Sequence, residues 1–244
     1  VPNTWYRARL LATHDGVDVT GVTLPGLPAV VAGSNGRVAW GFTNSYGDFQ
    51  DLVVVEPAPG ERERYLAPGG LRTFERHAES IEVAGGEPVR LEVVETVWGP
   101  LVGEDASGRP VALAWTAHRR EALNLALFDL ERAADLESAM AVAARAGIPA
   151  QNALIGDAAG RIGWVIAGRI PERSGFDGSR PASWAREGTG WSGWIEPARQ
   201  PRLADPAGGQ AWSANARVIG GEALAILGDG GYAHGARSRQ IRDR

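Results

Sequence analysis

Three short segments of the chain share one pattern: a polar turn, a Gly-Arg pair and then a strand that ends in tryptophan. Their sequences are SNGRVAW, DASGRPVALAW and DAAGRIGW. A glycine beside Asn, Asp or Ser is typical of a tight turn, because glycine reaches positive φ at little steric cost. The pattern predicts three hairpins, and Asn35-Gly36 predicts a type I′ turn with positive φ at both central residues.

A repeated hairpin is also the unit of a β-propeller, so the spacing of the three turns matters. Their glycines, Gly36, Gly108 and Gly160, are separated by 72 and 52 residues. A propeller needs a fixed period, so we interpret the segments as three separate hairpins of one sheet system. An irregular propeller that acts as a binding module stays open as the alternative.

Strands are also predicted for most of the remaining sequence. Alternating or β-branched runs fill residues 5–56, 73–116 and 152–170. The Gly- and Pro-rich stretches 57–72 and 171–209 predict irregular loops, and the second is long enough to suggest a functional role.

One segment, residues 122–147, has apolar residues at helical spacing. Asp135 is a suitable N-cap because its side chain can accept a hydrogen bond from the first turn. Gly147 and Pro149 are suitable stop signals, so a helix is predicted from Asp135 to about Ala146. The chain is therefore strand-rich with few helices.

Composition excludes several classes of function. The 244 residues carry a net charge of −4 without a basic patch, so nucleic acid is not an expected partner. No apolar run is long enough for a transmembrane helix, so no membrane partner is expected. Cysteine is absent, which removes disulfides, thiolate metal sites and a cysteine nucleophile within the chain. The four histidines show no metal-ligand spacing.

Both ends of the chain suggest a piece of a longer protein. The first residue is Val1 rather than Met, and the last residues, RSRQIRDR, have helical character without a cap or a stop signal. We therefore expect an internal cut or a processing site at each end.

A long stretch near the start reads VTGVTLPGLPAVVAGSNGRVAWGFTNSYGDFQDLVVVE. Further segments follow it, at residues 98–103, 149–171, 188–194 and 213–218, and then Arg237. In order and spacing this series resembles the β chain of the penicillin acylase family, whose members are N-terminal-nucleophile hydrolases. The resemblance covers essentially the whole chain, which makes it more specific than any single motif.

The resemblance implies a fold, an activity and partners. We expect an α+β fold, the four-layer αββα sandwich, with residues 1–244 as a strand-rich part of a single β-chain domain. The implied activity is hydrolysis of a non-peptide amide, such as a β-lactam side chain or an acyl-homoserine lactone, with no organic cofactor. The implied partners are an acylated small-molecule amide and an α chain from the same precursor, in a periplasmic or secreted protein.

The nucleophile that the resemblance implies lies outside the chain. In this family a Ser, Thr or Cys exposed by autocatalytic cleavage attacks the acyl carbon, and its own α-amino group acts as the base through water. That residue should precede Val1, and a C-terminal remainder should follow Arg244. We therefore expect these 244 residues alone to be inactive; a non-catalytic relative that only binds acylated ligands stays open as the alternative.

Three catalytic candidates follow from the resemblance. Asn215, in SANAR, matches the Asn whose side-chain amide completes the oxyanion hole, and Asn44 matches the position whose backbone N–H is the second donor. Arg237 matches an Arg near the amino group of the nucleophile. The structural alternatives are a turn Asn, a loop Asn and a solvated helix Arg.

Two aspartates, Asp48 and Asp51, match calcium ligands of the family, with Gln50 contributing its backbone carbonyl. Hard oxygen ligands suit Ca²⁺, which needs several of them, so other segments must contribute. Asp229 and a carbonyl within 178–181 are the weaker candidates. A bound Ca²⁺ would have a structural role; the alternative is a pair of loop-capping aspartates.

Four residues align with the side chains that line the acyl pocket in relatives: Ala32, Phe42, Trp115 and Gln151. Ala32 replaces an aromatic residue of phenylacetyl-specific members, and Gln151 replaces an apolar one. Both changes argue against a preference for the penicillin G side chain, and the smaller residue at position 32 would admit a longer or differently shaped acyl group. Trp115 is equally well explained as a core residue.

Overall fold

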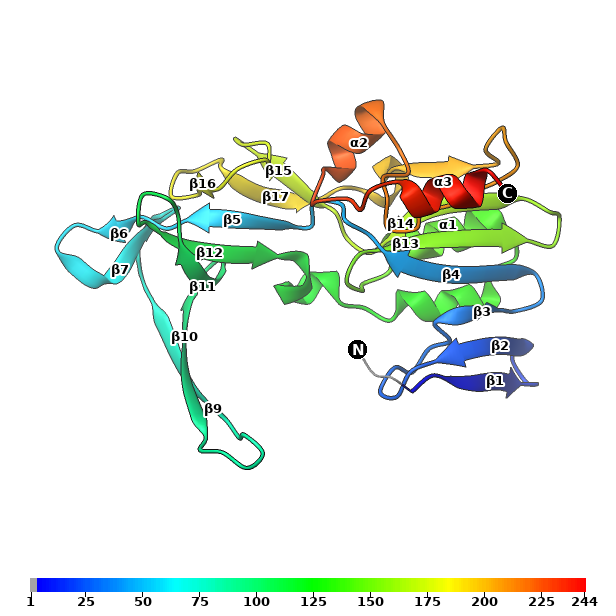
Figure 1. Cartoon of the computed structure of the whole chain (residues 1–244), viewed down its shortest axis with the longest axis horizontal. Coiled ribbons are helices and arrows are strands. Elements are labelled where there is room, and N and C mark those ends of the chain that lie inside the picture. Colours follow the sequence, from blue (N-terminus) through cyan, green and yellow to red (C-terminus); the bar gives the residue numbers. More distant parts are fainter. Residues whose placement is uncertain (1–3) are drawn as a thin grey trace. The chain divides into compact units, whose positions relative to one another are not determined.

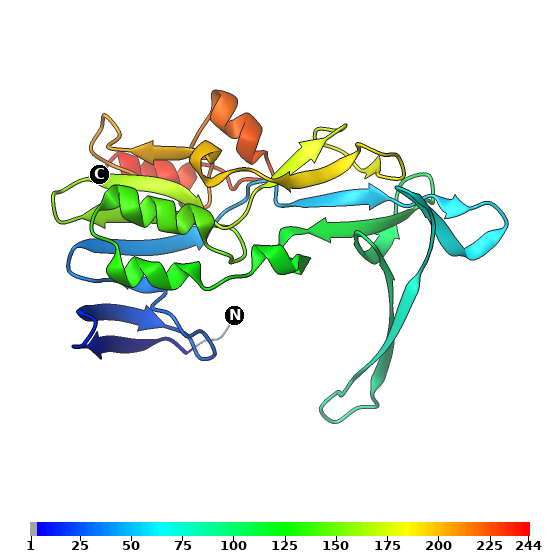
Figure 2. The same cartoon turned by 180° about the vertical axis from the view of Figure 1, so that it is seen from behind.

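The computed structural model describes residues 4–244, which form two compact units (Figures 1 and 2). Unit 1 contains residues 4–49, 119–170 and 195–244, and unit 2 contains residues 50–118 and 171–194. The chain therefore passes between the units four times, and unit 2 consists of two separate segments. That the two units belong to a single domain stays a prediction.

Unit 1 is organised around a seven-stranded sheet whose adjacent strands are all antiparallel. The order across the sheet is β1-β2-β3-β4-β13-β14-β18. The strands are β1 (Tyr6–Ala12), β2 (Val17–Thr23), β3 (Ala32–Ser34), β4 (Val38–Asn44), β13 (Gln151–Asp157), β14 (Ile162–Ala167) and β18 (Arg202–Ala204).

Helices cover both faces of this sheet. The helical segments of unit 1 are η2 (Arg120–Ala122), η3 (Ala126–Arg132), α1 (Leu136–Arg145), η4 (Pro197–Arg199), α2 (Gly221–Leu227) and α3 (Ala236–Arg242). Figure 2 shows α1 in front of β13 and β14, and Figure 1 shows α3 in front of the same strands from the other side. One core lies beneath α1 and η3, and a second contains Trp164, Ile166 and Leu227 on the other face.

Helix α1 forms where the sequence predicts it. Asp135 is the N-cap: its side chain accepts a hydrogen bond from the Ser138 backbone N–H (2.8 Å), and the Ser138 hydroxyl faces back to Asp135 in a capping box. These hydrogen bonds from Ser138 lower the pKa of the Asp135 carboxyl. The helix ends at Arg145, with Ala146 as the C-cap, one residue before Gly147.

Close packing of α1 on the sheet requires a glycine in β14. A Cβ atom added at Gly163 would lie 2.8 Å from the Met140 sulfur, 2.9 Å from the Leu203 carbonyl oxygen and 3.0 Å from Leu136. These approaches are too short for any side chain at this position. Gly163 therefore lets the helix and the edge strand β18 approach β14 together.

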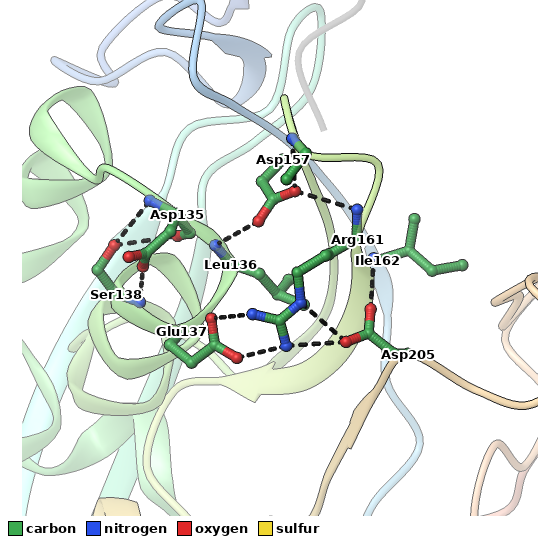
Figure 3. A network of polar contacts seen from close by, with 9 residues as sticks. Asp135, Leu136, Glu137, Ser138, Asp157, Arg161, Ile162 and Asp205 are labelled. Atoms are coloured by element: carbon green, nitrogen blue, oxygen red, sulfur yellow. Dashed lines mark hydrogen bonds and ion pairs between the residues drawn. The ribbon is translucent and has the colours of Figure 1, made fainter.

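A polar network joins the start of α1 to the β13–β14 turn (Figure 3). One carboxylate oxygen of Asp157 accepts from the backbone N–H groups of Ala159 and Arg161 (3.0 Å each), and the other accepts from the Leu136 N–H (3.2 Å). Arg161 in turn forms ion pairs with Glu137 (2.5 Å) and Asp205 (2.8 Å), which raise the pKa of its guanidinium. Asp157 thus stabilises the β13–β14 turn. It also accepts a hydrogen bond from a backbone N–H in the first turn of α1, where the helix itself offers no acceptor.

Unit 2 is a second antiparallel sheet system in which only β16 pairs with a parallel neighbour. Its six-stranded sheet has the order β16-β5-β12-β11-β10-β9, beside a three-stranded sheet β6-β7-β8 and a pair β15-β17. The elements are β5 (Gln50–Val54), β6 (Pro57–Ala58), β7 (Glu61–Ala67), β8 (Gly70–Thr73), β9 (Glu75–Ile81), β10 (Val89–Thr96), β11 (Gly99–Glu104), β12 (Pro110–Trp115), η1 (Thr116–His118), β15 (Pro171–Ser174), β16 (Ala182–Ser183) and β17 (Gly190–Trp194).

Aromatic side chains form the core of unit 2. Trp184 is 2% exposed and has Trp98, Phe176 and Trp191 around it, with ring centroids 6.4, 5.3 and 5.9 Å away. These spacings are typical of edge-to-face and tilted aromatic pairs. The two segments of unit 2 therefore share one core, since Trp98 comes from the first and the other three rings come from the second.

The three predicted hairpins are present, with two corrections. They do not belong to one sheet system, since the Asn35 and Asp157 turns lie in the sheet of unit 1 and the Asp105 turn in that of unit 2. The Asn35-Gly36 turn is also not of type I′, because only one of these two residues, Gly36, has positive φ (82°). The Asn35 side chain accepts from the backbone of Arg37 and Val38 (2.9 Å each) and so stabilises the turn in another way.

Both stretches predicted as irregular loops contain strands. Residues 57–72 form the hairpins of β6, β7 and β8, and residues 171–209 include β15 to β18. Composition was misleading because many glycines here, such as Gly69, Gly175 and Gly188, have positive φ in turns between short strands. None of the described helices has the length and the apolar character needed to cross a membrane.

The network in Figure 3 predicts an unequal effect of two similar substitutions. Asp157 and Asp105 each accept two backbone hydrogen bonds within a turn, but only Asp157 also contacts a helix. Asp157→Ala should lower the free energy of unfolding by ~2 kcal/mol, since a turn and a helix start lose their acceptor together. Chemical denaturation measures this effect, and Asp105→Ala is the matched control with a smaller one. Equal losses in the two variants would contradict the dual role of Asp157.

Candidate active site

The three predicted catalytic residues lie together at one end of the unit 1 sheet. Asn44 is the last residue of β4, opposite Gln151 at the start of β13. The Asn215 side-chain amide donates to the Asn44 carbonyl oxygen (3.0 Å), and Arg237, on α3, donates to the Asn215 amide oxygen (2.9 Å). Residues separated by up to 193 positions in the chain are therefore joined by two hydrogen bonds.

These contacts determine which way the Asn215 amide points. A guanidinium can only donate a hydrogen bond and a backbone carbonyl can only accept one. The amide oxygen of Asn215 must therefore face Arg237, and its N–H₂ group must face Asn44. The result is a neutral donor directed at the end of β4.

The backbone at Asn215 is also unusual. Its φ is +63° and that of Ala214 is +47°, in the left-handed region that few residues other than glycine, Asn and Asp adopt readily. The Asn215 carbonyl accepts from the Ala233 N–H (3.0 Å), and Ser213 accepts from Ala216 (2.8 Å). Backbone hydrogen bonds thus stabilise the turn that carries the Asn215 amide.

Buried hydroxyl groups connect this turn to β4 and α3. The Ser213 hydroxyl lies 2.6 Å from that of Thr43, the neighbour of Asn44. The Ser238 hydroxyl, on α3, donates to the Ser213 carbonyl (2.8 Å). An open hollow of about 500 Å³ lies beside them, and Thr43, Ser213 and Arg237 are among its lining residues. A ligand at this end of the sheet would therefore have both space and polar partners.

A sequence profile of the family described as penicillin amidase matches residues 1–244, the whole chain. The chain belongs to the penicillin amidase family. The prediction made from the motifs is thereby confirmed.

Relatives of this penicillin amidase chain include two kinds of acylase. It is 33% identical to the acyl-homoserine lactone acylase QuiP of Pseudomonas syringae pv. syringae over 82% of this chain and 25% of that protein. It is 31% identical to the penicillin acylase 2 proenzyme of Pseudomonas sp. strain SE83, over 84% and 27% of the two chains. The chain thus spans about a quarter of the length of these curated relatives.

A solved structure shows the same fold. The thermostable penicillin G acylase of Alcaligenes faecalis superimposes with a TM-score of 0.77 at 22% identity, over 98% of this chain and 44% of that one. The chain therefore has the α+β, strand-rich fold of an N-terminal-nucleophile hydrolase, as predicted.

The predicted acyl-pocket residues of this penicillin amidase chain do not share one surface. Phe42 and Gln151 lie on the same face of the unit 1 sheet, because Phe42 pairs with Ala153 and Gln151 with Asn44. Ala32 pairs with Val22, and strand alternation places it on the other face. Trp115 belongs to unit 2, where it ends β12, is 37% exposed and lies edge-on to His118. Exposure of Trp115 argues against the alternative of a core tryptophan.

The predicted calcium ligands of the penicillin amidase chain fall in both units. Asp48 is in unit 1, where its backbone N–H donates to Leu227 (2.8 Å), and Gln50 is the exposed first residue of β5 in unit 2. Asp229 caps its own turn by accepting from the Gly231 and Tyr232 N–H groups. Burial, Asp229 and Asp48 together raise the pKa of Tyr232 to about 12, so both carboxylates act on one hydroxyl.

Asp51 is the most unusual of these residues. It is 4% exposed, and one carboxylate oxygen accepts from Arg173 (2.9 Å) and from the Trp191 indole N–H (2.6 Å). The other oxygen is buried and has no hydrogen-bond partner among residues 4–244. Burial raises the pKa of the Asp51 carboxyl despite the nearby Arg173 charge. A buried oxygen without a partner is costly, and a cation is one means of satisfying it.

The segment 178–181 is placed near Asp51 by strand pairing. It leads into β16, where Ala182 pairs with Val53 of β5 in parallel. Residues before Ala182 therefore run beside residues before Val53, among them Asp51. A backbone carbonyl of this segment remains a candidate ligand.

One group of side chains that could bind a metal ion was not predicted from the sequence. Glu75, His77 and Glu95 have ligand atoms within 4.8 Å of one another on the β9–β10 hairpin. Cross-strand pairing brings Glu75 and Glu95 together, which their separation in the sequence concealed. Glu75 and His77 are exposed and Glu95 is partly buried, and their proximity alone does not establish a site.

Three residues beside the predicted catalytic residues were not predicted from the sequence: Thr43, Asn152 and Ser213. The Asn152 amide donates to Thr43 (3.1 Å) and to the Asn44 carbonyl (3.0 Å). Asn152 directly follows Gln151 at the start of β13, so its position among polar residues offered little signal in the sequence. A buried Asn in a strand must have partners, and here they are at the end of β4.

The raised pKa of Asp51 predicts a pH dependence. A carboxyl that binds its proton more tightly when folded stabilises the protein below its unfolded pKa of ~4, and this contribution is lost as the pH rises through the folded pKa. In the absence of divalent metal, the free energy of unfolding of wild type should therefore fall more steeply above pH ~4 than that of Asp51→Asn. Chemical denaturation over this range tests the prediction, and parallel curves for the two proteins would refute it.

Proposed function

We propose that the full-length protein is an amide hydrolase that removes the acyl group from a non-peptide amide. The substrate class is a β-lactam with an acylated amine or an acyl-homoserine lactone, the two classes named for its relatives. The observation that carries the proposal is the Asn215 amide, fixed between Arg237 and the Asn44 backbone. The Asn215 NH₂ group has a second N–H besides the one that binds the Asn44 carbonyl, and this neutral donor together with the Asn44 backbone N–H would suit the oxyanion of acyl transfer.

In the proposed mechanism the nucleophile is a Ser, Thr or Cys on a segment outside these 244 residues. Its hydroxyl or thiol attacks the amide carbon, and its α-amino group takes the proton through water. The carbonyl oxygen becomes an oxyanion that accepts from the Asn215 side chain and the Asn44 backbone N–H. Neutral donors stabilise this charge without a proton transfer of their own.

Arg237 has two roles in this mechanism. Its hydrogen bond holds the Asn215 amide in the donating orientation. A guanidinium near the nucleophile's α-amino group would also lower the pKa of that amine, because a nearby positive charge disfavours the ammonium form. The amine would then be neutral, and able to act as base, at lower pH.

The other parts of the proposal rest on the resemblance. Of the four residues that the resemblance assigns to the acyl pocket, Ala32, Phe42, Trp115 and Gln151, we propose that Phe42 and Gln151 contact the acyl group, because these two share a face of the unit 1 sheet. The acyl group is one other than phenylacetyl. The partner is an α chain cut from the same precursor, and the mature protein is periplasmic or secreted.

We also propose a structural Ca²⁺ held by Asp48, Asp51 and the Gln50 carbonyl. The buried, unpartnered oxygen of Asp51 fits a cation ligand, and carboxylate and carbonyl oxygens are the donors that Ca²⁺ prefers. The ion would neutralise a carboxylate whose charge is disfavoured by burial. The Arg173 ion pair leaves one oxygen of Asp51 for this purpose.

Removing the Asn215 donor tests the catalytic proposal. Asn215→Gly keeps the left-handed backbone but has no amide, and Asn215→Asp keeps the shape but replaces the donor by an acceptor. In the full-length protein each should lower kcat by ~10²-fold or more, as loss of an oxyanion donor does. Hydrolysis of N-octanoyl homoserine lactone and of penicillin G, followed by release of the amine, gives the measurement.

Two controls accompany this test. The 244-residue chain alone should give no turnover, because the proposed nucleophile lies on another segment. Asn124→Asp changes an Asn of unit 1 that bonds to Arg145 and Gly147, and it should leave kcat near wild type. Near-normal turnover in both Asn215 variants would remove this residue from the site. No turnover by the full-length wild type would favour the non-catalytic relative.

Calcium dependence tests the metal proposal. Addition of Ca²⁺ to the metal-free full-length protein should raise Tm by ~5 °C, because the ion binds only the folded state. Asp48→Ala and Asp51→Asn should abolish this increase and impair maturation. Asp105→Asn, in an exposed turn of unit 2, should retain it. Unchanged stability and metal content in Asp48→Ala would contradict the proposal.

A further inference from the structure

The buried amide of Asn152 is the least expected polar group of the unit 1 sheet. It is the second residue of β13, and it is 2% exposed. Its amide nitrogen donates to the Thr43 hydroxyl (3.1 Å) and to the Asn44 carbonyl (3.0 Å), and its oxygen accepts from the Trp164 indole N–H (2.9 Å). Both ends of the amide are therefore satisfied, as a buried polar group requires.

The Asn44 carbonyl receives two amide donors, one from Asn152 and one from Asn215, each at 3.0 Å. A second connection runs from Asn152 through the Thr43 hydroxyl to the Ser213 hydroxyl, two residues before Asn215. The end of β4 and the turn at 213–215 are thus joined by a closed set of hydrogen bonds, and Asn152 is the member that contacts both residues of β4.

The orientation of the Asn152 amide is determined by Trp164. An indole N–H can only donate, so it must meet the amide oxygen, which directs the amide nitrogen at Asn44. Trp164 is fully buried in the core on this face of the sheet and cannot turn away without disrupting it. The hydrogen bond from Trp164 in the core therefore determines the direction of the amide group that binds Asn44, the last residue of β4.

We propose that Asn152 is a positioning residue for the oxyanion site. It holds the backbone of Asn44 so that the Asn44 N–H and the Asn215 amide are directed at the same point. This inference rests on the proposed function, because it assigns Asn152 to the support of those two donors. Donors of this kind act by being fixed before the charge develops, so a small displacement lowers kcat more than it changes binding of the uncharged substrate.

The test uses the full-length protein with two variants. Asn152→Leu replaces the amide by an apolar side chain of similar size, and Trp164→Phe removes only the N–H that orients it. The matched control is Gln200→Leu, since Gln200 is also a buried amide of unit 1 that donates to two carbonyls, those of Ala144 (3.0 Å) and Gly168 (3.2 Å). A general effect of losing a buried amide would appear equally in this control.

Kinetics are measured with N-octanoyl homoserine lactone or penicillin G, whichever the wild type hydrolyses, well below the Tm of every variant. The concentration of active sites is determined by titrating the nucleophile with an acylating inhibitor. The value of kcat is calculated per active site, so unfolded protein does not lower it. Asn152→Leu should lower kcat by ~10- to 100-fold with KM within about threefold of wild type. Trp164→Phe should give a smaller loss of the same kind, and Gln200→Leu should retain the wild-type kcat.

The outcomes separate this inference from the proposed function. Full activity in Asn215→Gly would refute the oxyanion site itself. Loss of activity in Asn215→Gly together with wild-type kcat in Asn152→Leu would refute the positioning role alone. If Asn152→Leu does not fold, Trp164→Phe decides: a lower kcat at unchanged KM supports the role, and a kcat equal to that of Gln200→Leu overturns it.

Discussion

The pairing of β4 with β13 is the constraint on which the candidate site depends. Their antiparallel register runs from Val38 opposite Asp157 to Asn44 opposite Gln151. Because side chains alternate, a slip of one residue in this pairing would place Thr43 and Asn152 on opposite faces of the sheet and break the hydrogen bond between them. At the other end of the pair the Ala158 N–H donates to the Arg37 carbonyl (2.8 Å), and the adjoining Asp157 turn is joined to the start of helix α1 (Figure 3).

Much of the fold could be predicted, because its signals are local. Asp135 as N-cap with Gly147 as stop signal predicts the helix, and the Gly-Arg turns predict hairpins, since each signal needs only a few neighbouring residues. The three catalytic candidates were also found in the sequence, but through family order and spacing rather than through chemistry. No local pattern indicates that Asn215 and Asn44, 171 residues apart, share a hydrogen bond.

The features that were not predicted depend on distant partners. The Asn35 turn is not of type I′ because its side chain has another role: the amide nitrogen donates to carbonyls of Leu130 and Ala133 (3.1 and 2.8 Å), nearly a hundred residues away. Asn152 looked like an ordinary strand residue until Trp164 and Asn44 were placed around it. Long-range polar contacts of this kind fix the precise geometry, and a single sequence does not record them.

The construction of unit 2 from two separate segments has a consequence for how such a protein can be changed. Asp51 lies in the first segment, and both of its described donors, Arg173 and Trp191, lie in the second. Trp98 and Trp184 are divided between the segments in the same way. An ancestor that acquired residues 50–118 alone would have carried a buried carboxylate without partners and half of an aromatic core. The unit could therefore be gained, lost or exchanged between relatives only by two matched insertions, and a single crossover within the gene would not preserve it.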